Sequence, residues 1–448
     1  MKRALALLGL AAAAVVAPGG IAPAAARPAA PAPARTLQHL VLMTQSGRSF
    51  DNYFGARPGV DNIPTDACQR PSHVNQPACV KPYPLGPSPK QIQLRSAAAV
   101  QQASVAKGAM NGFVLAQTTR ESDGTAALGY FRPADLPLLN DLADQGMVFD
   151  HWFGGVPGGS VANRLFDVTA RAAGDPSTVP VSGWSNQAVI FDRLTNAGIP
   201  WRIYVQNYEP ALTVDTASSK QRRGGQVTRV PLLAMRRYLD DPKAMSHIVD
   251  LSRYYRDAVT GTLPAVSVVV TTSSTEQAPQ DPAKGNTLAR AVVNALISSP
   301  EWSSSAFLLQ YDSSGGWYDH VRPPRLAGAT VGLRVPALMI SPFVAPGTVD
   351  HRVYDAASTL RLIETTWSLE PLAERDRTAG DLRQAIDLRA RPRPAALIGV
   401  PTDQPVLQPD STFLYVGYLG AIAVALAIVG VTVGTTTVRD RRRRMVTA

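Results

Sequence analysis

The sequence predicts an α/β fold, in which buried strands alternate with helices. Four short apolar runs rich in β-branched residues are typical of buried strands: His39–Thr44, Ala265–Thr272, Ala306–Asp312 and Pro336–Ser341. Helical patterns lie between these runs, and this alternation favours helices packed on a central sheet. The chain has 448 residues, which is enough to bury a large core.

Three segments carry apolar residues at helical spacing. Asp135–Gly146 closes on a glycine, Ala283–Trp302 ends near Pro300, and Asp355–Trp367 follows the last predicted strand. No internal repeat interrupts this order, so residues 36–397 are predicted to form one domain.

Ligand sites in such sheets lie beyond the carboxyl ends of the strands. The loops Gln45–Asp51, Ser273–Pro279 and Asp312–His320 are therefore the places to look for chemistry. A further loop, Gly154–Phe166, is rich in glycine and enters a helix at Ser160. A helix N-terminus there suits an anion or an activated hydroxyl, and an ordinary N-cap serine is the alternative.

Residues 1–26 are predicted to be a cleaved signal peptide that directs export; a membrane-retained N-terminal anchor is the alternative. Residues 1–26 combine Lys2 and Arg3 with an apolar stretch shorter than the roughly 20 residues that a membrane span needs, and they end in small residues. Residues 27–35 form a Pro/Ala linker.

The carboxyl-terminal residues are predicted to anchor the chain. After a linker at 398–412, residues 413–438 contain no charged side chain and are long enough to cross a bilayer; a buried core helix is the alternative. The basic tail at 439–448 follows at once, which predicts that it stays in the cytoplasm. We therefore expect a single-pass membrane protein whose domain is extracytoplasmic.

Charge and cysteines add two expectations. The net charge is +10, with a local basic cluster at Lys220–Gly225 that indicates a solvated loop or, as a second interpretation, attraction to anionic lipid or phosphate. No nucleic-acid motif is present. Cys68 and Cys79 are the only cysteines, and in an exported domain such a close pair predicts a disulfide.

Five stretches together resemble one family. They are "GRSFDNYFG" (Gly47–Gly55), "GGSVANRLF" (Gly158–Phe166), "AGIPWRIY" (Ala197–Tyr204), "YDSSGGWYDHVRPP" (Tyr311–Pro324) and "RVPALMISP" (Arg334–Pro342). In this order they resemble the bacterial phosphoesterase family of non-specific phospholipases C and certain acid phosphatases. The resemblance covers nearly all of the domain and implies an alkaline-phosphatase-like three-layer sandwich.

The resemblance also implies a site. Ser160 falls at the nucleophile position, followed by Asn163 and Arg164, and Asp312 falls at a metal-ligand position. His320 matches as well and is a weaker catalytic candidate. For His320, as for Asp51 and Asp319, we favour a structural role in satisfying buried backbone groups.

The departures from the family pattern fall on the implied metal and acid–base groups. Ser46 and Gly47 stand where the family has Glu and Asn, and Ser313 replaces the second acid of the later motif. After the Ala265–Thr272 strand the family's histidine is missing although Glu276 is kept, and Ala356 replaces a second histidine. A hard divalent cation such as Ca²⁺ needs about six to eight oxygen ligands, so this set predicts weak metal binding.

Three hypotheses follow. In the first, which we favour, the chain is a catalytically degenerate phosphoesterase-family protein without a tightly bound cofactor, which binds a phosphorylated lipid or an envelope protein. In the second, it hydrolyses phosphate esters or phospholipids through Ser160 with a divalent metal such as Ca²⁺, recruiting Glu276 or His320. In the third, it is a structural scaffold in an envelope complex.

Overall fold

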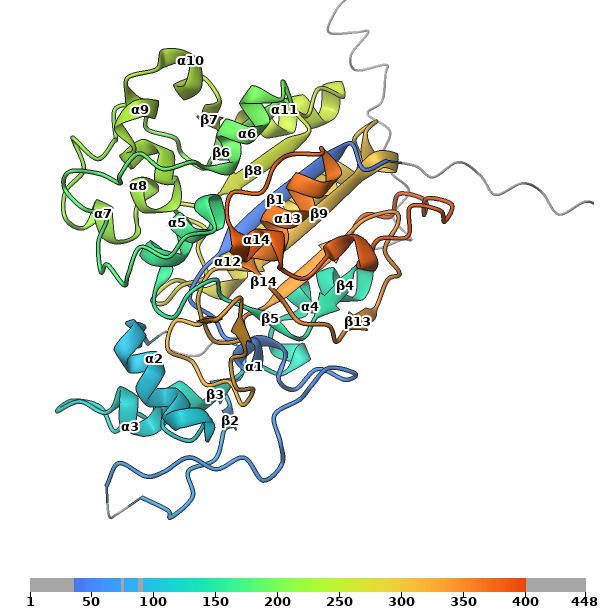
Figure 1. Ribbon diagram of the computed structural model, residues 1–448. Coiled ribbons are helices and arrows are strands. Elements are labelled where there is room, and N and C mark those ends of the chain that lie inside the picture. The colour runs from blue at the N-terminus through green and yellow to red at the C-terminus, as the bar shows by residue number, and fades with distance from the viewer. Residues whose placement is uncertain (1–35, 74–75, 88–91, 400–448) are drawn as a thin grey trace, which may run out of the picture.

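A mixed sheet of eight strands forms the centre of the molecule (Figure 1). The computed structural model describes residues 36–73, 76–87 and 92–399. The strands lie in the order β13-β4-β12-β9-β1-β8-β6-β7. Their bounds are β1 His39–Gln45, β4 Met147–Phe149, β6 Trp201–Val205, β7 Ile248–Asp250, β8 Val266–Val270, β9 Ser305–Tyr311, β12 Ala337–Ile340 and β13 Thr348–Asp350.

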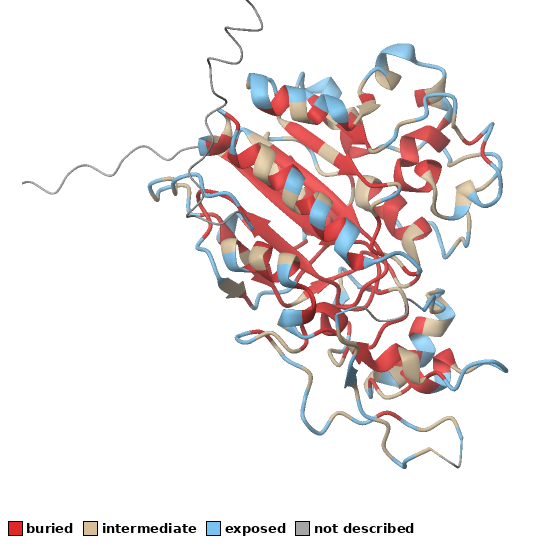
Figure 2. Ribbon diagram, turned by 180° about the vertical axis from the view of Figure 1, so that it is seen from behind, coloured by how far each residue is buried: buried red, intermediate tan, exposed pale blue. Residues whose placement is uncertain are grey.

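Strand direction determines where polar loops gather. β1 pairs in parallel with both β8 and β9, β6 continues the parallel run to β7, and β12 alone is antiparallel, to β9 and β4. Seven strands therefore end at the same edge, which we call the carboxyl rim. The central strands are buried on both faces, and in Figure 2 they are red along their length, which explains their continuous apolar runs.

Helices cover both faces of the sheet. On one face α4 (Pro137–Gln145) and α11 (Ser252–Thr260) pack against the long helix α12 (Pro282–Ile297). On the other face α5 (Ser160–Thr169) packs against α13 (Ala356–Thr366), which lies across the front of the sheet in Figure 1. The three layers agree with the predicted sandwich.

The remaining elements are short and lie around these layers. The helices are α1 Phe50–Phe54, α2 Ala98–Val105, α3 Phe113–Gln117, α6 Ile190–Asn196, α7 Gln221–Gly224, α8 Gln226–Arg229, α9 Arg236–Leu239, α10 Pro242–Met245 and α14 Glu374–Arg377. The 3₁₀ turns are Ala106–Gly108, Thr125–Leu128, Pro133–Asp135, Pro231–Ala234, Trp302–Ser304 and Leu382–Ala385. The strands are β2 Tyr83–Pro84, β3 Gly129–Tyr130, β5 Trp152–Phe153, β10 Arg325–Leu326, β11 Ala329–Thr330 and β14 Tyr354–Asp355.

All four predicted strands and all three predicted helices are present, with bounds that differ by a few residues. The largest difference is at α12, which ends at Ile297 and is followed by a separate 3₁₀ turn at Trp302–Ser304. Strands β4, β6, β7 and β13 were not predicted. β4, β7 and β13 have three residues each, too few to show a periodic pattern, and β6 has five.

The predicted disulfide is confirmed. Cys68 and Cys79 are bonded, with 5.1 Å between their Cα atoms, and Gln69 pairs with Val80 beside them. The bond closes the loop between these two residues.

The predicted targeting and membrane segments lie outside the described residues. This applies to the signal peptide (1–26), the first linker (27–35), nearly all of the second linker, the span (413–438) and the basic tail (439–448). Among the residues that the structure does describe, no helix is both long and apolar enough to span a bilayer. The single-pass anchor remains a prediction.

The buried side chain of Arg334 connects helix α1 with the loop that contains Asp319. The side chain of Arg334 is 0% exposed; its Nη2 donates to Asp51 Oδ1 at 2.7 Å and its Nε to Asp319 Oδ1 at 3.0 Å. Its guanidinium also lies 4.4 Å from the centre of the Phe50 ring. Both carboxylates also accept from backbone amides, Asp51 from His320 at 2.8 Å and Asp319 from Asp51 at 3.1 Å, which are the contacts expected of a structural role.

We expect Arg334→Met to lower the free energy of unfolding by about 3–5 kcal/mol, because it leaves two buried carboxylates without their counter-charge. Urea unfolding followed by circular dichroism measures the change. The control is Arg377→Ala, which breaks a 60%-exposed pair with Glu374 and should change the stability by no more than about 1 kcal/mol. Equal effects of the two substitutions would contradict the role given to Arg334.

Candidate functional site

The site lies at the carboxyl rim, where β1 and β9 end side by side. Gln45 and Tyr311 are paired in register, so the next residues, Ser46 and Asp312, emerge together. The Ser46 hydroxyl donates to Asp312 Oδ2 at 2.6 Å. Parallel pairing thus brings together two residues that are far apart in the sequence.

Helix α5 adds Ser160 to this pair. The helix begins at Ser160 and Gly159 is its N-cap, so Ser160 is not a capping residue and that alternative was wrong. Its hydroxyl lies 3.0 Å from Asp312 Oδ1 and 3.2 Å from the Ser313 hydroxyl. The first turn of the helix therefore points a hydroxyl at the carboxylate.

Asn163 holds the loop that delivers Ser160. Its side-chain oxygen accepts from the Val156 amide at 3.0 Å, and its side-chain nitrogen donates to the carbonyls of Val156 and Gly159 at 3.1 Å each. Asn163 is fully buried. It is a positioning residue, since these partners are all backbone groups of its own loop.

The Asp312 carboxylate accepts four hydrogen bonds, from Arg164 Nε at 2.7 Å and from the hydroxyls of Ser46, Ser160 and Ser313. A carboxylate has about four lone-pair sites. The chain therefore fills the accepting capacity of this group with its own donors.

Two arginines meet at Ser46. Arg164 Nη2 lies 3.2 Å from the Ser46 hydroxyl oxygen and also donates to the Thr44 carbonyl at 2.6 Å, and Arg229 Nη1 lies 3.4 Å from the same hydroxyl. Burial, helped by the nearby Arg164 charge, lowers the pKa of Arg229 to about 10, so it remains cationic at neutral pH. Two guanidinium groups thus face one carboxylate, Asp312.

A second acidic residue, Asp167, lies near Arg164 but accepts no hydrogen bond from it. Its carboxyl oxygens are buried and have no hydrogen-bond partner within the described part of the chain. Burial raises the pKa of Asp167 to about 7, against the opposing effect of Arg164. Burial therefore opposes the negative charge that Asp167 would add beside Arg164.

A cavity of about 730 Å³ is lined by Arg229. The exposed Lys220 and Arg223 also line it, as do Thr272 and Thr275. The basic cluster noted in the sequence therefore lines one cavity together with Arg229, whose Nη1 lies 3.4 Å from the Ser46 hydroxyl. An anion entering it would meet three cationic side chains.

Comparison with known proteins identifies the family. The family model described as "Phosphoesterase family" matches residues 37–370, which is most of the chain. The chain belongs to the Phosphoesterase family.

Curated relatives of this phosphoesterase chain include plant and bacterial enzymes. Non-specific phospholipase C6 of Arabidopsis thaliana is 26% identical over 84% of this chain and 75% of its own length. Non-hemolytic phospholipase C of Pseudomonas aeruginosa is 27% identical over 79% of this chain and 57% of its own length, and phospholipase C B of Mycobacterium tuberculosis is 27% identical over 80% and 79%.

Solved structures overlap only partly with this chain. A protein in the alkaline phosphatase superfamily from Vibrio parahaemolyticus gives a TM-score of 0.37 at 12% identity, covering 78% of this chain and 71% of that chain. The family assignment therefore rests on the sequence match.

The metal site implied for the phosphoesterase family does not fit the residues present around Asp312. Asp312 already accepts four hydrogen bonds, and the Arg229 guanidinium beside Ser46 adds a positive charge that would oppose a divalent cation. Gly47 has φ of +77°, and a Cβ at that position would lie 2.8 Å from Gln277 Cγ. The asparagine that the family has there would therefore be both strained and obstructed.

Glu276 belongs to a separate hydrogen-bonded cluster of side chains. Its Oε2 accepts from the hydroxyls of Tyr53 at 2.7 Å and Tyr311 at 2.5 Å. Burial raises the pKa of Glu276 to about 7, because it outweighs the tyrosine hydrogen bonds and the charge of Arg48. These contacts hold the carboxyl between β9 and α1.

His320 also belongs to another cluster. Its Nδ1 lies 2.8 Å from Asp51 Oδ2 and its Nε2 lies 3.3 Å from Asp61 Oδ1. Burial lowers the pKa of His320, but the Asp51 hydrogen bond and charge raise it more, so the net shift is upward. The imidazole is thus engaged in the Arg334 network described above.

Arg229 is the site residue that sequence reasoning missed. It lies four residues beyond the basic cluster Lys220–Gly225, and its side chain is almost fully buried. Its only sequence signal was an arginine between apolar residues, in "QVTRVPLL". A buried position for such an arginine requires partners that only the fold brings near.

We expect the unfolding free energy of Glu276→Gln, relative to that of the unmodified protein, to increase as the pH rises from 5 to 8. The folded state keeps the Glu276 proton up to about pH 7 whereas the unfolded chain loses it near 4.5, so stability falls with rising pH across that window. The glutamine does not titrate. Between pH 5 and pH 8 this relative unfolding free energy should change by about 3 kcal/mol, at about 1.4 kcal/mol per pKa unit.

Urea unfolding at the two pH values measures this difference. The exposed Glu374→Gln substitution is the control and should show no comparable trend. A Glu276→Gln difference that stays constant with pH would show that the carboxyl is ionised throughout.

Proposed function

We propose that this chain is a phosphoesterase-family protein that binds a phosphate-bearing ligand beside Ser46 and Arg229 but does not hydrolyse it by metal-dependent chemistry. The observation that carries the proposal is the pair of guanidiniums, Arg164 and Arg229, at one fully hydrogen-bonded carboxylate. Arginine is well suited to phosphate because its planar fork donates two parallel hydrogen bonds.

Ligand binding is supported by the charge and shape of the cavity. Lys220 and Arg223 lie at the exposed side and Arg229 at the buried side, so positive charge extends inward toward Ser46. A buried cation without a full counter-charge is destabilising, and an anionic ligand would supply that charge. An anionic ligand would therefore both fit the charge of the cavity and neutralise the buried Arg229.

Lack of hydrolysis is supported by the state of Ser160. A serine hydroxyl needs a metal or a neighbouring base to become a strong nucleophile. Its nearest carboxylate, Asp312, is paired with Arg164 and hydrogen-bonded to three hydroxyls, so it is a weak proton acceptor. Glu276 and His320 are hydrogen-bonded in other clusters.

The ligand class that we propose is a phosphorylated lipid head group. The relatives are phospholipases C by name, and the predicted terminal segments would hold this domain beside a membrane. A head group would present its phosphate to Arg229 while its acyl chains stay in the bilayer.

We expect Arg229→Gln to weaken binding of inorganic phosphate and of p-nitrophenyl phosphorylcholine by about tenfold or more. One charge-assisted hydrogen bond contributes about 1.5–3 kcal/mol, which corresponds to that range. Isothermal titration calorimetry on the full-length chain in EDTA measures the affinities. The double variant Lys220→Gln/Arg223→Gln, on exposed positions, should weaken binding without altering the melting temperature.

The matched control is Arg253→Gln, which removes the same charge from α11, where Arg253 pairs with Asp257. It should leave phosphate affinity unchanged. Equal weakening by Arg253→Gln would show that the loss of affinity comes from the lower net charge of the protein and not from the site. Absence of phosphate binding in the unmodified chain would refute the proposal.

We also expect no turnover of p-nitrophenyl phosphate or p-nitrophenyl phosphorylcholine above that of Ser160→Ala, in EDTA or with Ca²⁺, Mg²⁺, Mn²⁺ or Zn²⁺. Release of p-nitrophenol, followed by absorbance, is the measurement. Turnover that disappears in Ser160→Ala would establish the alternative, an active hydrolase with Ser160 as its nucleophile.

A further inference from the structure

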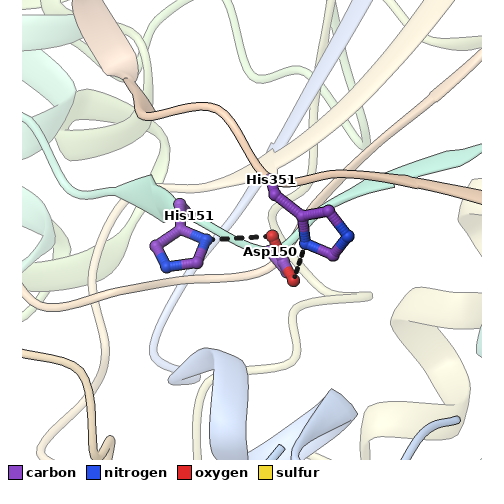
Figure 3. Close-up of side chains that lie close together, drawn as sticks. All are labelled: Asp150, His151 and His351. Atoms are coloured by element: carbon purple, nitrogen blue, oxygen red, sulfur yellow. Dashed lines mark hydrogen bonds and ion pairs between the residues drawn. The ribbon is translucent and has the colours of Figure 1, made fainter. Parts of the chain in front are cut away.

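A second polar cluster occupies the other side of the carboxyl rim. β4 and β13 pair in parallel with Phe149 opposite Asp350, so the residues that follow, Asp150 and His351, emerge side by side. His151 comes next on the β4 side. Figure 3 shows both imidazoles turned toward the carboxylate between them.

The ligand atoms of the three side chains lie close together. His151 Nδ1 lies 3.0 Å from Asp150 Oδ1, and His351 Nδ1 lies 2.8 Å from Asp150 Oδ2. One ligand atom from each residue lies within 4.8 Å of the others. The Asp150 side chain is 0% exposed and that of His351 is 64% exposed, so the carboxylate is fixed and the cluster is open to solvent on one side.

The charges around this cluster differ from those around Asp312. The Asp150 carboxylate accepts from the two histidines and from the Asp61 amide at 2.9 Å. The Asp61 carboxylate lies 3.5 Å from His151 Nε2 and is also paired with Arg334 Nη1 at 3.4 Å. Arg334 donates to the Asp150 carbonyl at 3.0 Å but forms no ion pair with the Asp150 carboxylate among the described residues; its carboxylate partners are Asp51, Asp61 and Asp319.

We propose that Asp150, His151 and His351 bind Zn²⁺ or a similar imidazole-preferring divalent cation. Neutral imidazole and carboxylate are the ligands that Zn²⁺ favours, whereas Ca²⁺ and Mg²⁺ prefer oxygen ligands alone. Three protein ligands leave a position for water or an exogenous ligand. The bound ion would connect the ends of β4 and β13.

A neighbouring triad is a less suitable site. Asp51, Asp319 and His320 also have ligand atoms within 4.8 Å of one another. Both of these carboxylates are ion-paired with the buried Arg334, whose charge is permanent. A cation there would have to displace or oppose that guanidinium.

The test is titration of the full-length chain with ZnCl₂ after EDTA treatment and dialysis, by isothermal titration calorimetry, with Co²⁺ absorption as a second readout. We expect saturable binding of one ion per chain. His351→Ala and His151→Ala should each raise the dissociation constant by about tenfold or more and abolish the Co²⁺ d–d bands. His73→Ala, which removes an exposed histidine outside the cluster, should change neither.

Absence of saturable binding in the unmodified chain would overturn the proposal. Binding that survives in His351→Ala and is lost in His320→Ala would overturn it too, because the ion would then occupy the Arg334 network. His351 is exposed, so its variant should fold normally, which equal melting temperatures without metal would verify.

Discussion

The buried ion pair between Arg164 and Asp312 is the interaction on which the candidate site depends. It joins the first turns of α5 to the end of β9, and through the Thr44 carbonyl the same guanidinium also holds the end of β1. The position that the family resemblance assigns to a metal is thus bordered by a permanent cation of the chain itself. The guanidinium is part of the chain and is always charged, so this positive charge is present whether or not a ligand is bound.

The carboxyl rim carries two clusters of opposite character. At β1 and β9, two guanidiniums lie beside the Asp312 carboxylate, and the ligand that we propose there is an anion. At β4 and β13, a buried carboxylate lies between two imidazoles, and a cation is the complementary ligand. Both follow from one topological fact: parallel strands end at the same edge, and the loops that follow them converge there. The difference lies in which side chains each loop delivers.

Much of the fold could be predicted because buried strands and amphipathic helices leave periodic apolar patterns, as in Ala306–Asp312 and Ala283–Trp302. The convergence of Ser160 and Asp312 could be predicted from family motifs. Arg229 could not, because a lone arginine in an apolar stretch has no pattern that distinguishes a buried site residue from an exposed one. The pairing of Asp150 with His351 was missed for a similar reason, since strands of three residues give no periodicity.

The sequence by itself determined the layered α/β architecture and the disulfide, because these depend on periodic apolar patterns and on the spacing of two cysteines. Only the tertiary structure decided which charged groups surround Asp312. Burial and proximity are properties of the folded chain, and they alone set the four hydrogen bonds on Asp312, the second guanidinium at Ser46 and the obstruction of any side chain at Gly47. The electrostatic sign of a pocket depends on distances between residues that are remote in sequence, so it can be read only after the chain has folded.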